Sequence, residues 1–252
     1  MAYLLAIDIG NTNITVGLFR GAKLIGKTKI STFFYSSYIK RIKALIKECG
    51  LKMDDVGSVV ISSVVPLSLA RLIVELRKMG GAINITILGK GLKVPIRNMY
   101  RIKNEVGQDR LVNAYAAKIL YGTPAVIVDF GTAITFDIVS KKGDYLGGLI
   151  LPGIELSLSS LYKKTALLPK VELKAASSII GKDTVNSMRG GILFGFGAMC
   201  DSLVARYKKI LGKSTKVIAT GGSSDLMRRY AKSIQHVDEN LTLRGLQLIS
   251  VK

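Results

Sequence analysis

The stretch AIDIGNTNITVGLF, residues 6–19, places the six residues DIGNTN (8–13) between two apolar runs. The runs Tyr3 to Ile7 and Ile14 to Phe19 are rich in β-branched and aromatic residues, which predicts two strands. DIGNTN is then a hairpin turn. Its glycine lets the backbone approach an anion, its amides and hydroxyls can donate hydrogen bonds, and its carboxylate can hold a metal ion. The turn is a candidate cradle for phosphate and Mg²⁺, although ordinary hairpin turns use the same residue types.

The composition is that of a globular chain. The 252 residues are 48% hydrophobic and 21% charged, which suits one large domain or two of ordinary size. The most apolar run, Gly190 to Cys200, stops at Asp201 and is shorter than the roughly 18 residues that a membrane helix needs. No basic leader precedes Asp8. We therefore expect a cytoplasmic protein with no signal peptide and no membrane association.

The chain is strongly basic. Lysine and arginine outnumber aspartate and glutamate 37 to 17, a formal net charge of +20, which suits an anionic substrate as well as nucleic acid. The basic residues are dispersed, without a long basic block or a zinc-finger pattern, so we do not expect nucleic-acid binding. Cys49 and Cys200 lie far apart and form no CxxC motif, which predicts reduced thiols rather than a disulfide or a metal site.

The patterns after the opening hairpin predict the order β-β-β-α-β-α-β for the first half of the chain. The predicted elements are a third strand at Leu24 to Ser31, helices at Tyr38 to Cys49 and Pro66 to Met79, and strands at Ser58 to Val65 and Ile83 to Leu88.

The second half repeats this plan. Two strands flank a turn at Asp129 to Ala133, and a third strand, two helices, a strand and a final helix, strand and helix follow. Aligning Asp8-x-Gly10 with Asp129-x-Gly131 superposes strand on strand, with a hydroxyl or amide after each glycine. This indicates an internal duplication. We expect the two turns to face each other across a cleft, so that both carboxylates converge on one polyphosphate.

The ranges predicted for this second half are strands at Thr123 to Val128, Ile134 to Val139, Tyr145 to Leu151 and Lys216 to Ala219, and helices ending near Lys164 and spanning Thr184 to Leu211.

Three other patterns are less persuasive. Residues 21–28, GAKLIGKT, match the Walker A motif, but Lys27 to Phe34 is strand-like where that motif needs a helix N-terminus. Residues 129–131 spell the DFG of protein kinases without an HRD loop or a glycine-rich loop. His236, the only histidine, falls at a predicted strand end, where we expect a structural role.

The segment Gly107-Gln108-Asp109-Arg110 precedes a predicted helix at Leu111 to Leu120, where the two halves meet. Asp109 can be the N-cap of that helix. It can equally be a site residue whose carboxylate holds an alcohol while Arg110 holds an acid. The residues by themselves leave both interpretations open.

These motifs, in this order, resemble the type III pantothenate kinases of the acetate and sugar kinase, Hsp70 and actin superfamily. The matching segments, which run through nearly the whole chain, are DIGNT (8–12), GQDR (107–110), DFGTA (129–133), GG (147–148) with PG (152–153), TALLP (165–169), GKDT (181–184) and TGG (220–222). The resemblance implies an α/β fold of two duplicated ribonuclease H-like, actin-like ATPase domains. It implies mixed β-sheets, a cleft between the domains, and halves at residues 1–110 and 111–252.

The resemblance also implies a reaction, the transfer of the γ-phosphoryl group of ATP to pantothenate. The product would be 4′-phosphopantothenate, at the first step of coenzyme A synthesis. By position, Asp109 is the general base, Asp8 anchors Mg²⁺ and Asp129 binds an activating monovalent cation, K⁺ or NH₄⁺. The family is dimeric, which implies a homodimer whose pantothenate pocket is completed across the interface.

The remaining site residues follow from the same resemblance. It assigns ATP to Asp8, Ile9, Gly10, Asn11, Thr12, Asn13, Ile14, Thr15, Thr132, Gly221 and Gly222, and pantothenate to Tyr100, Gly107, Gln108, Asp109, Arg110 and Thr184. Two alternatives stay open: a non-enzymatic transcription accessory factor on the same fold, and a related kinase acting on a sugar or polyphosphate. The intact set of three aspartates argues against the accessory factor.

Overall fold

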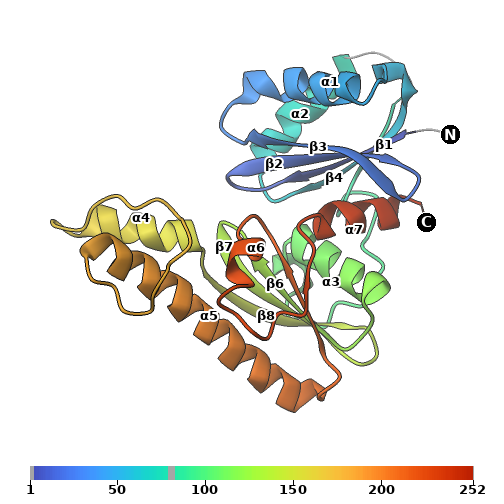
Figure 1. Cartoon of the computed structure of the whole chain (residues 1–252). Coiled ribbons are helices and arrows are strands. Elements are labelled where there is room, and N and C mark those ends of the chain that lie inside the picture. Colours follow the sequence, from blue (N-terminus) through green and yellow to red (C-terminus); the bar gives the residue numbers. More distant parts are fainter. Residues whose placement is uncertain (1–2, 79–82, 252) are drawn as a thin grey trace. The chain divides into compact units, whose positions relative to one another are not determined.

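The computed structural model of the chain describes residues 3–78 and 83–251, which form two compact units (Figure 1). The first unit comprises the described residues of 1–96, 101–116 and 241–252. The second unit comprises residues 97–100 and 117–240. The last helix of the chain therefore belongs with the first strands.

The first unit is built on a mixed five-stranded sheet in the order β3-β2-β1-β4-β5. Tight turns join the first three strands, which pair antiparallel, whereas β4 and β5 follow helices and pair parallel, as crossover connections require. The strands are β1 (Tyr3–Ile9), β2 (Asn13–Arg20), β3 (Lys23–Ser31), β4 (Val56–Ser63) and β5 (Asn84–Ile87).

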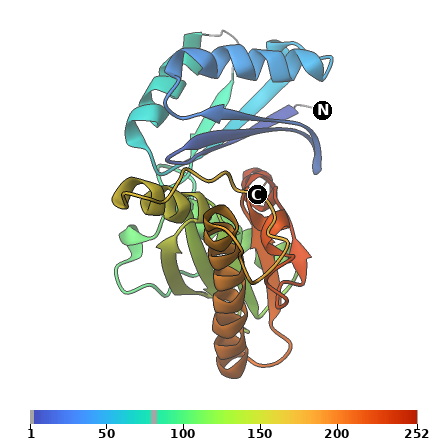
Figure 2. The same cartoon turned by 60° about the vertical axis from the view of Figure 1, so that its left-hand side comes forward.

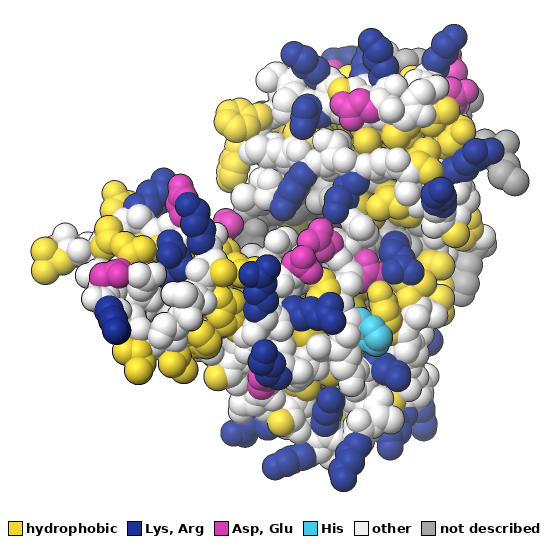
Figure 3. Space-filling view, in the orientation of Figure 1, with side chains coloured by type: hydrophobic (Ala, Val, Ile, Leu, Met, Phe, Trp, Pro, Cys, Tyr) yellow, Lys and Arg dark blue, Asp and Glu magenta, His cyan; other side chains and the backbone are white. Residues whose placement is uncertain are grey.

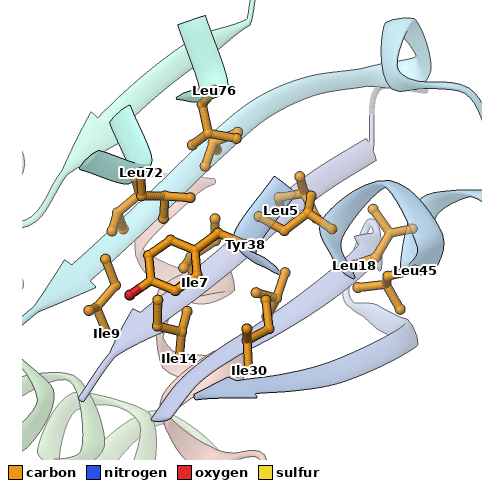
Figure 4. Close-up of a cluster of buried hydrophobic side chains, with 14 of the residues drawn as sticks. Leu5, Ile7, Ile9, Ile14, Leu18, Ile30, Tyr38, Leu45, Leu72 and Leu76 are labelled. Carbon is orange, nitrogen blue, oxygen red and sulfur yellow. The ribbon is translucent and has the colours of Figure 1, made fainter. Parts of the chain in front are cut away.

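Helices cover both faces of this sheet (Figure 1). On one face lie α1 (Tyr38–Glu48) and α2 (Pro66–Lys78), and on the other lies α7 (Leu241–Ser250). The apolar stripes of α1 and α2 pack on the strands and form the core drawn in Figure 4. Gly245 lets α7 approach α3 (Gln108–Leu120) closely, because a Cβ there would come within 2.6 Å of Val112 Cγ1.

The second unit repeats this sheet in the order β10-β9-β6-β7-β8. The long helix α5 lies along the sheet (Figure 2) and contributes Leu193, Cys200 and Val204 to its core. The elements are β6 (Ala125–Phe130), β7 (Ala133–Val139), β8 (Tyr145–Pro152), β9 (Lys216–Thr220) and β10 (His236–Val237), with helices α4 (Ile154–Lys164), α5 (Thr184–Leu211) and α6 (Ser224–Met227). The described ranges also contain three short 3-10 helices: η1 (Tyr35–Ser37), η2 (Met53–Asp55) and η3 (Lys103–Glu105).

The predicted duplication is confirmed by the strand orders. Read from the edge, β3-β2-β1-β4-β5 and β8-β7-β6-β9-β10 have the same connectivity. Each aspartate pairs with a hydroxyl residue on either side: Asp8 with Thr15 and Ser62, and Asp129 with Thr135 and Thr220. The turns differ in length, because four residues separate Ile9 from its partner Ile14 and three separate Phe130 from Ile134.

The predicted α/β class and element order are confirmed, with shifted boundaries. The strand predicted at Ser58 to Val65 is β4, which begins and ends two residues earlier, at Val56 and Ser63. Asp129 and Phe130 belong to strand β6 rather than to the turn. The predicted helix end at Met79 lies outside the described residues. The division at residue 110 stays a prediction.

Several simpler predictions concern single residues. The Walker A match lies in the turn at residues 21–22 and in strand β3, and not at a helix N-terminus, as expected. Cys49 and Cys200 are free thiols, and burial raises the pKa of Cys200 to about 12, which keeps that thiol protonated. His236 lies in β10 with its ring centroid 5.1 Å from that of Tyr121.

None of the helices in the described ranges is both long and apolar enough to cross a bilayer.

Candidate active site

The first predicted phosphate turn joins β1 to β2. Gly10 N–H donates to the Asn13 carbonyl at 2.9 Å and closes the turn, which leaves Asn11 and Thr12 exposed. Asp8 stands two residues before the turn, half-buried on β1. All the residues predicted here, 8 to 15, are therefore gathered in one hairpin.

Ser62 was not predicted to be a site residue, but it lies beside Asp8 in the sheet. The two residues are register partners on the parallel strands β4 and β1, so their side chains leave the same face. Ser62 is fully buried, and its hydroxyl has no hydrogen-bond partner among the described residues. A buried hydroxyl next to a carboxylate is an oxygen donor pair of the kind that hard divalent cations and their waters use. Only the strand pairing could have singled out this serine.

The second predicted turn joins β6 to β7 and is held from beneath by Gly153. Gly131 N–H donates to the Ala133 carbonyl at 3.2 Å, and Gly153 N–H donates to the Thr132 carbonyl at 3.1 Å. A Cβ on Gly153 would overlap the Thr132 and Gly131 carbonyl oxygens. The PG motif at 152–153 therefore has a structural reason: only glycine fits under this turn.

Glycine backbone also surrounds the Asp129 carboxylate. A Cβ on Gly131 would lie 3.2 Å from Asp129 Oδ1, and a Cβ on Gly221, whose φ is 87°, would collide with the same oxygen. The TGG motif thus brings main chain against Asp129 in a conformation that favours glycine. The Asp129 carboxylate is therefore packed closely against the main chain of both motifs.

Asp109 is the second residue of α3, so the N-cap interpretation is wrong: the helix begins one residue earlier, at Gln108. Its Oδ1 accepts from the Arg110 backbone N–H at 2.9 Å. A Cβ on Gly107 would collide with that oxygen, which explains why glycine precedes the helix. Burial raises the pKa of Asp109 above its usual value of 3.8, against the smaller lowering effects of the Arg110 N–H and guanidinium.

Tyr100, predicted to contact pantothenate, rests on the second sheet. Its ring centroid lies 6.4 Å from that of Tyr145, and the Gly147 main chain packs against it, since a Cβ there would be 3.2 Å from the ring. Tyr145 in turn donates its hydroxyl to the fully buried Asp137 at 2.9 Å, and Thr135 donates to the same carboxylate at 3.0 Å. Asp137 and Tyr145 therefore fix the surface on which Tyr100 lies. The sequence reasoning did not find them.

The other residues predicted to bind pantothenate lie in two places. Gly107, Gln108, Asp109 and Arg110 form the start of α3, with Arg110 buried at 6% exposure. Thr184 is the exposed first residue of α5. The preceding Asp183 caps that helix by accepting from Asn186 N–H at 2.8 Å, which orders the turn that carries Thr184.

The chain matches the family model of type III pantothenate kinase over residues 4–206. It is 38% identical over 252 residues to the type III pantothenate kinase of Halalkalibacterium halodurans, with 99% of each chain covered. It is 40% identical over 249 residues to that of Geobacter sulfurreducens, with 98% of this chain and 97% of the relative covered. The chain belongs to the type III pantothenate kinase family.

Membership in this family makes the chain a phosphotransferase whose activity depends on ATP and a divalent metal ion. Solved structures share its fold. A polyphosphate/ATP-glucomannokinase from Arthrobacter superposes with a TM-score of 0.52 at 14% identity, covering 100% of this chain and 99% of that one. A Campylobacter jejuni protein described as a Baf family transcriptional activator superposes with a TM-score of 0.58 at 21% identity, covering 97% and 96%. The expected actin-like and sugar kinase fold is confirmed.

The raised pKa of Asp109 predicts a stability change with pH. Because the folded protein disfavours the charged carboxylate, stability should fall as pH rises through the raised pKa and stay reduced above it. Asp109→Asn removes this effect. The free energy of unfolding of Asp109→Asn should therefore exceed that of the parent by more at pH 7 than near pH 4. Urea denaturation at each pH measures this difference.

Asp183→Asn provides the opposite control. The Asn186 N–H lowers the pKa of Asp183, so this carboxylate stabilises the fold above its usual pKa, and the stabilisation is lost as pH falls through the lowered value. The variant should be less stable than the parent at pH 7, with the deficit shrinking in acid. A pH-independent difference for Asp109→Asn would contradict the raised pKa of Asp109.

Proposed function

We propose that Asp109 is the general base with which this pantothenate kinase transfers the γ-phosphoryl group of ATP to the primary hydroxyl of pantothenate. The observation that carries the assignment of the base is the half-buried Asp109 carboxylate at the start of α3, which accepts from the Arg110 N–H and has the buried Arg110 next to it. A raised pKa makes a carboxylate a better proton acceptor near neutral pH than an exposed aspartate would be.

In this mechanism Asp109 orients the pantothenate hydroxyl and accepts its proton as the new oxygen–phosphorus bond forms. The bond between the γ-phosphorus and the β,γ-bridging oxygen breaks, and ADP leaves with that oxygen. The protein needs little covalent chemistry for this transfer, since alignment and neutralisation of charge supply most of the catalysis. Arg110 offers a guanidinium to the pantothenate carboxylate.

The first hairpin supports phosphate binding. We assign the phosphates to residues 8 to 15. Asp8 would hold Mg²⁺, and the Ser62 hydroxyl, on the residue paired with Asp8 in the sheet, would be a further oxygen donor for the ion or one of its waters. Bound Mg²⁺ would neutralise phosphate charge during the transfer. The second turn contributes Thr132, and Gly221 with Gly222 provides a surface for the adenosine.

Asp129 is assigned to a monovalent cation, K⁺ or NH₄⁺. The support is its carboxylate, which the main chain of Gly131 and Gly221 approaches closely. Pantothenate is assigned to Tyr100, Thr184 and the residues from Gly107 to Arg110. We also propose a cytoplasmic location and, given the dispersed basic residues, no nucleic-acid partner.

A homodimer is supported by exposed apolar side chains on the second unit. They gather over β8, α4 and the segment after α4, a region where Figure 3 shows many hydrophobic atoms. Strand β8 is an edge strand, and Ile150 on it is 65% exposed. The apolar residues are Leu146, Leu149, Ile150, Leu156, Tyr162, Leu167, Ile179 and Ile180. Large exposed apolar side chains gathered on neighbouring elements are typical of an interface.

The central experiment measures ADP formation with and without pantothenate, in K⁺ and then in Na⁺. We expect ADP release to require pantothenate and to be faster in K⁺. Glucose and polyphosphate, offered as other acceptors, should give no turnover. ATP consumption that ignores pantothenate would overturn the proposed substrate, and equal rates in the two salts would overturn only the cation assignment.

Asp109→Asn should lower kcat by about 10² to 10⁴, because the proton acceptor is lost while the shape of the side chain is kept. The dissociation constant for ATP should stay within about twofold of the parent value, since Asp109 makes no proposed contact with the nucleotide. Asp54→Asn, on the exposed helix η2, is the matched control and should retain full turnover. Near-normal kcat in Asp109→Asn would remove this residue from the mechanism.

Light scattering should give a mass of about 54 kDa, twice the 27.2 kDa of one chain. Ile150→Glu should shift the protein toward the monomer and reduce activity, because a charge cannot be buried unpaired in an apolar interface. Ile210→Glu changes an equally apolar residue, 77% exposed near the end of α5 and outside the patch, and should leave the dimer intact. A dimer unaffected by Ile150→Glu would show that another surface is used.

A further inference from the structure

Thr32, the residue directly after β3, binds both sides of the first phosphate turn. Its backbone N–H donates to the Thr12 carbonyl at 3.0 Å, and its hydroxyl donates to the Gly10 carbonyl at 2.8 Å. The side chain is 3% exposed. One buried residue from a neighbouring strand therefore fixes two of the three peptide groups that make this turn.

These two bonds also set the direction of the turn's donors. In a trans peptide the C=O and the N–H of the next residue point in opposite directions. Holding the Gly10 and Thr12 carbonyls toward Thr32 therefore directs the N–H groups of Asn11 and Asn13 away from it. Successive N–H groups aimed to one side form the kind of concave donor set that binds phosphate.

Tyr38 holds Thr32 from the other side. It is the first residue of α1, and its hydroxyl donates to the Thr32 carbonyl at 2.5 Å. Figure 4 shows its ring within the core, with the hydroxyl oxygen near Ile9 and Ile14, the residues that flank the turn. The ring is 1% exposed, so packing prevents it from following a displaced loop.

The second unit gives an internal comparison. Strand pairing makes Gly153 the counterpart of Thr32, since Asn13 pairs with Ser31 and Ala133 pairs with Pro152. Gly153 makes the same main-chain bond, to the Thr132 carbonyl, but has no side chain and no space for one. The hydrogen bond from the Thr32 hydroxyl to the Gly10 carbonyl is therefore found at the first turn and has no counterpart at the second. The first turn is longer by one residue, so it has more backbone freedom for this bond to restrict.

We propose that Thr32 and Tyr38 are positioning residues for ATP: they hold the turn at residues 10–12 in the conformation that presents its N–H groups to the phosphates. The inference deepens the proposed function and rests on the assignment of this turn to ATP. Neither residue touches a substrate in this scheme. Their effect should therefore fall on nucleotide affinity and not on proton transfer.

Thr32→Val tests this directly, because it removes the hydroxyl and keeps the branched shape and the main-chain bond to Thr12. We expect the KM for ATP to rise about tenfold, the change that loss of one buried hydrogen bond produces. The KM for pantothenate and kcat should change by less than about twofold. Thr32→Ser, which restores a hydroxyl, should return the KM for ATP to within about threefold of the parent value.

Two further variants separate positioning from folding. Thr28→Val makes the same substitution in strand β3, just before Thr32, opposite Val16 and away from the turn, and should leave the KM for ATP unchanged. Tyr38→Phe should raise that KM by about threefold, since it frees Thr32 without removing its own bonds. A merely structural role would lower the melting temperature of both Thr32→Val and Tyr38→Phe and leave the KM for ATP at the parent value.

Thr12→Ala distinguishes failure of this proposal from failure of the phosphate site. If Thr12→Ala weakens ATP binding and Thr32→Val does not, the positioning role is overturned and the site stands. If direct titration shows that both variants bind ATP as tightly as the parent, the turn is not the phosphate site and both proposals fail. A parallel rise in both KM values would also overturn the specific role in nucleotide binding.

Discussion

A main-chain hydrogen bond at the end of the third strand holds each of the two proposed phosphate turns. Thr32 N–H reaches the Thr12 carbonyl in the first unit, and Gly153 N–H reaches the Thr132 carbonyl in the second. In both units the bond exists only because the third strand runs past the hairpin next to it. The antiparallel pairing of the first three strands therefore determines the shape of the turns, and the side chains near them adapt to that shape.

At the start of α3, the surroundings that suit the Asp109 carboxylate to act as a base also lower the stability of the fold. Burial disfavours the charged form of Asp109, and the Arg110 N–H and guanidinium compensate only in part. Gly107 provides the space that the carboxylate needs. In a more exposed aspartate, water would stabilise the charged carboxylate. Its pKa would then be lower, and it would be a weaker base.

Much of the architecture could be predicted from the sequence, since it rests on local patterns. Apolar runs rich in β-branched and aromatic residues predicted the strands, helical spacing predicted α1, and Asp8-x-Gly10 matched against Asp129-x-Gly131 predicted the duplication. Boundaries were less certain, because β-branched runs such as the one around β4 continue into the next turn.

The N-cap interpretation of Asp109, one of the two left open by the sequence, failed for a similar reason. A polar residue before an apolar run can stand just outside a helix or within its first turn, and only the backbone conformation decides. Thr32, Ser62 and Asp137 escaped prediction altogether. Each is an ordinary residue in its local sequence, and its role comes from a partner on another strand.

The return of α7 to the first unit has a consequence for synthesis on the ribosome. The helix covers one face of the opening sheet, with Leu243 against Gly17, yet it is encoded after the whole of the second unit. Residues 117–240 emerge as a continuous segment and can pack as they appear. Strands β1, β2 and β3 therefore lack the helix that covers one of their faces until residues 117–240 have been made, so the first unit is completed only after the second unit has emerged.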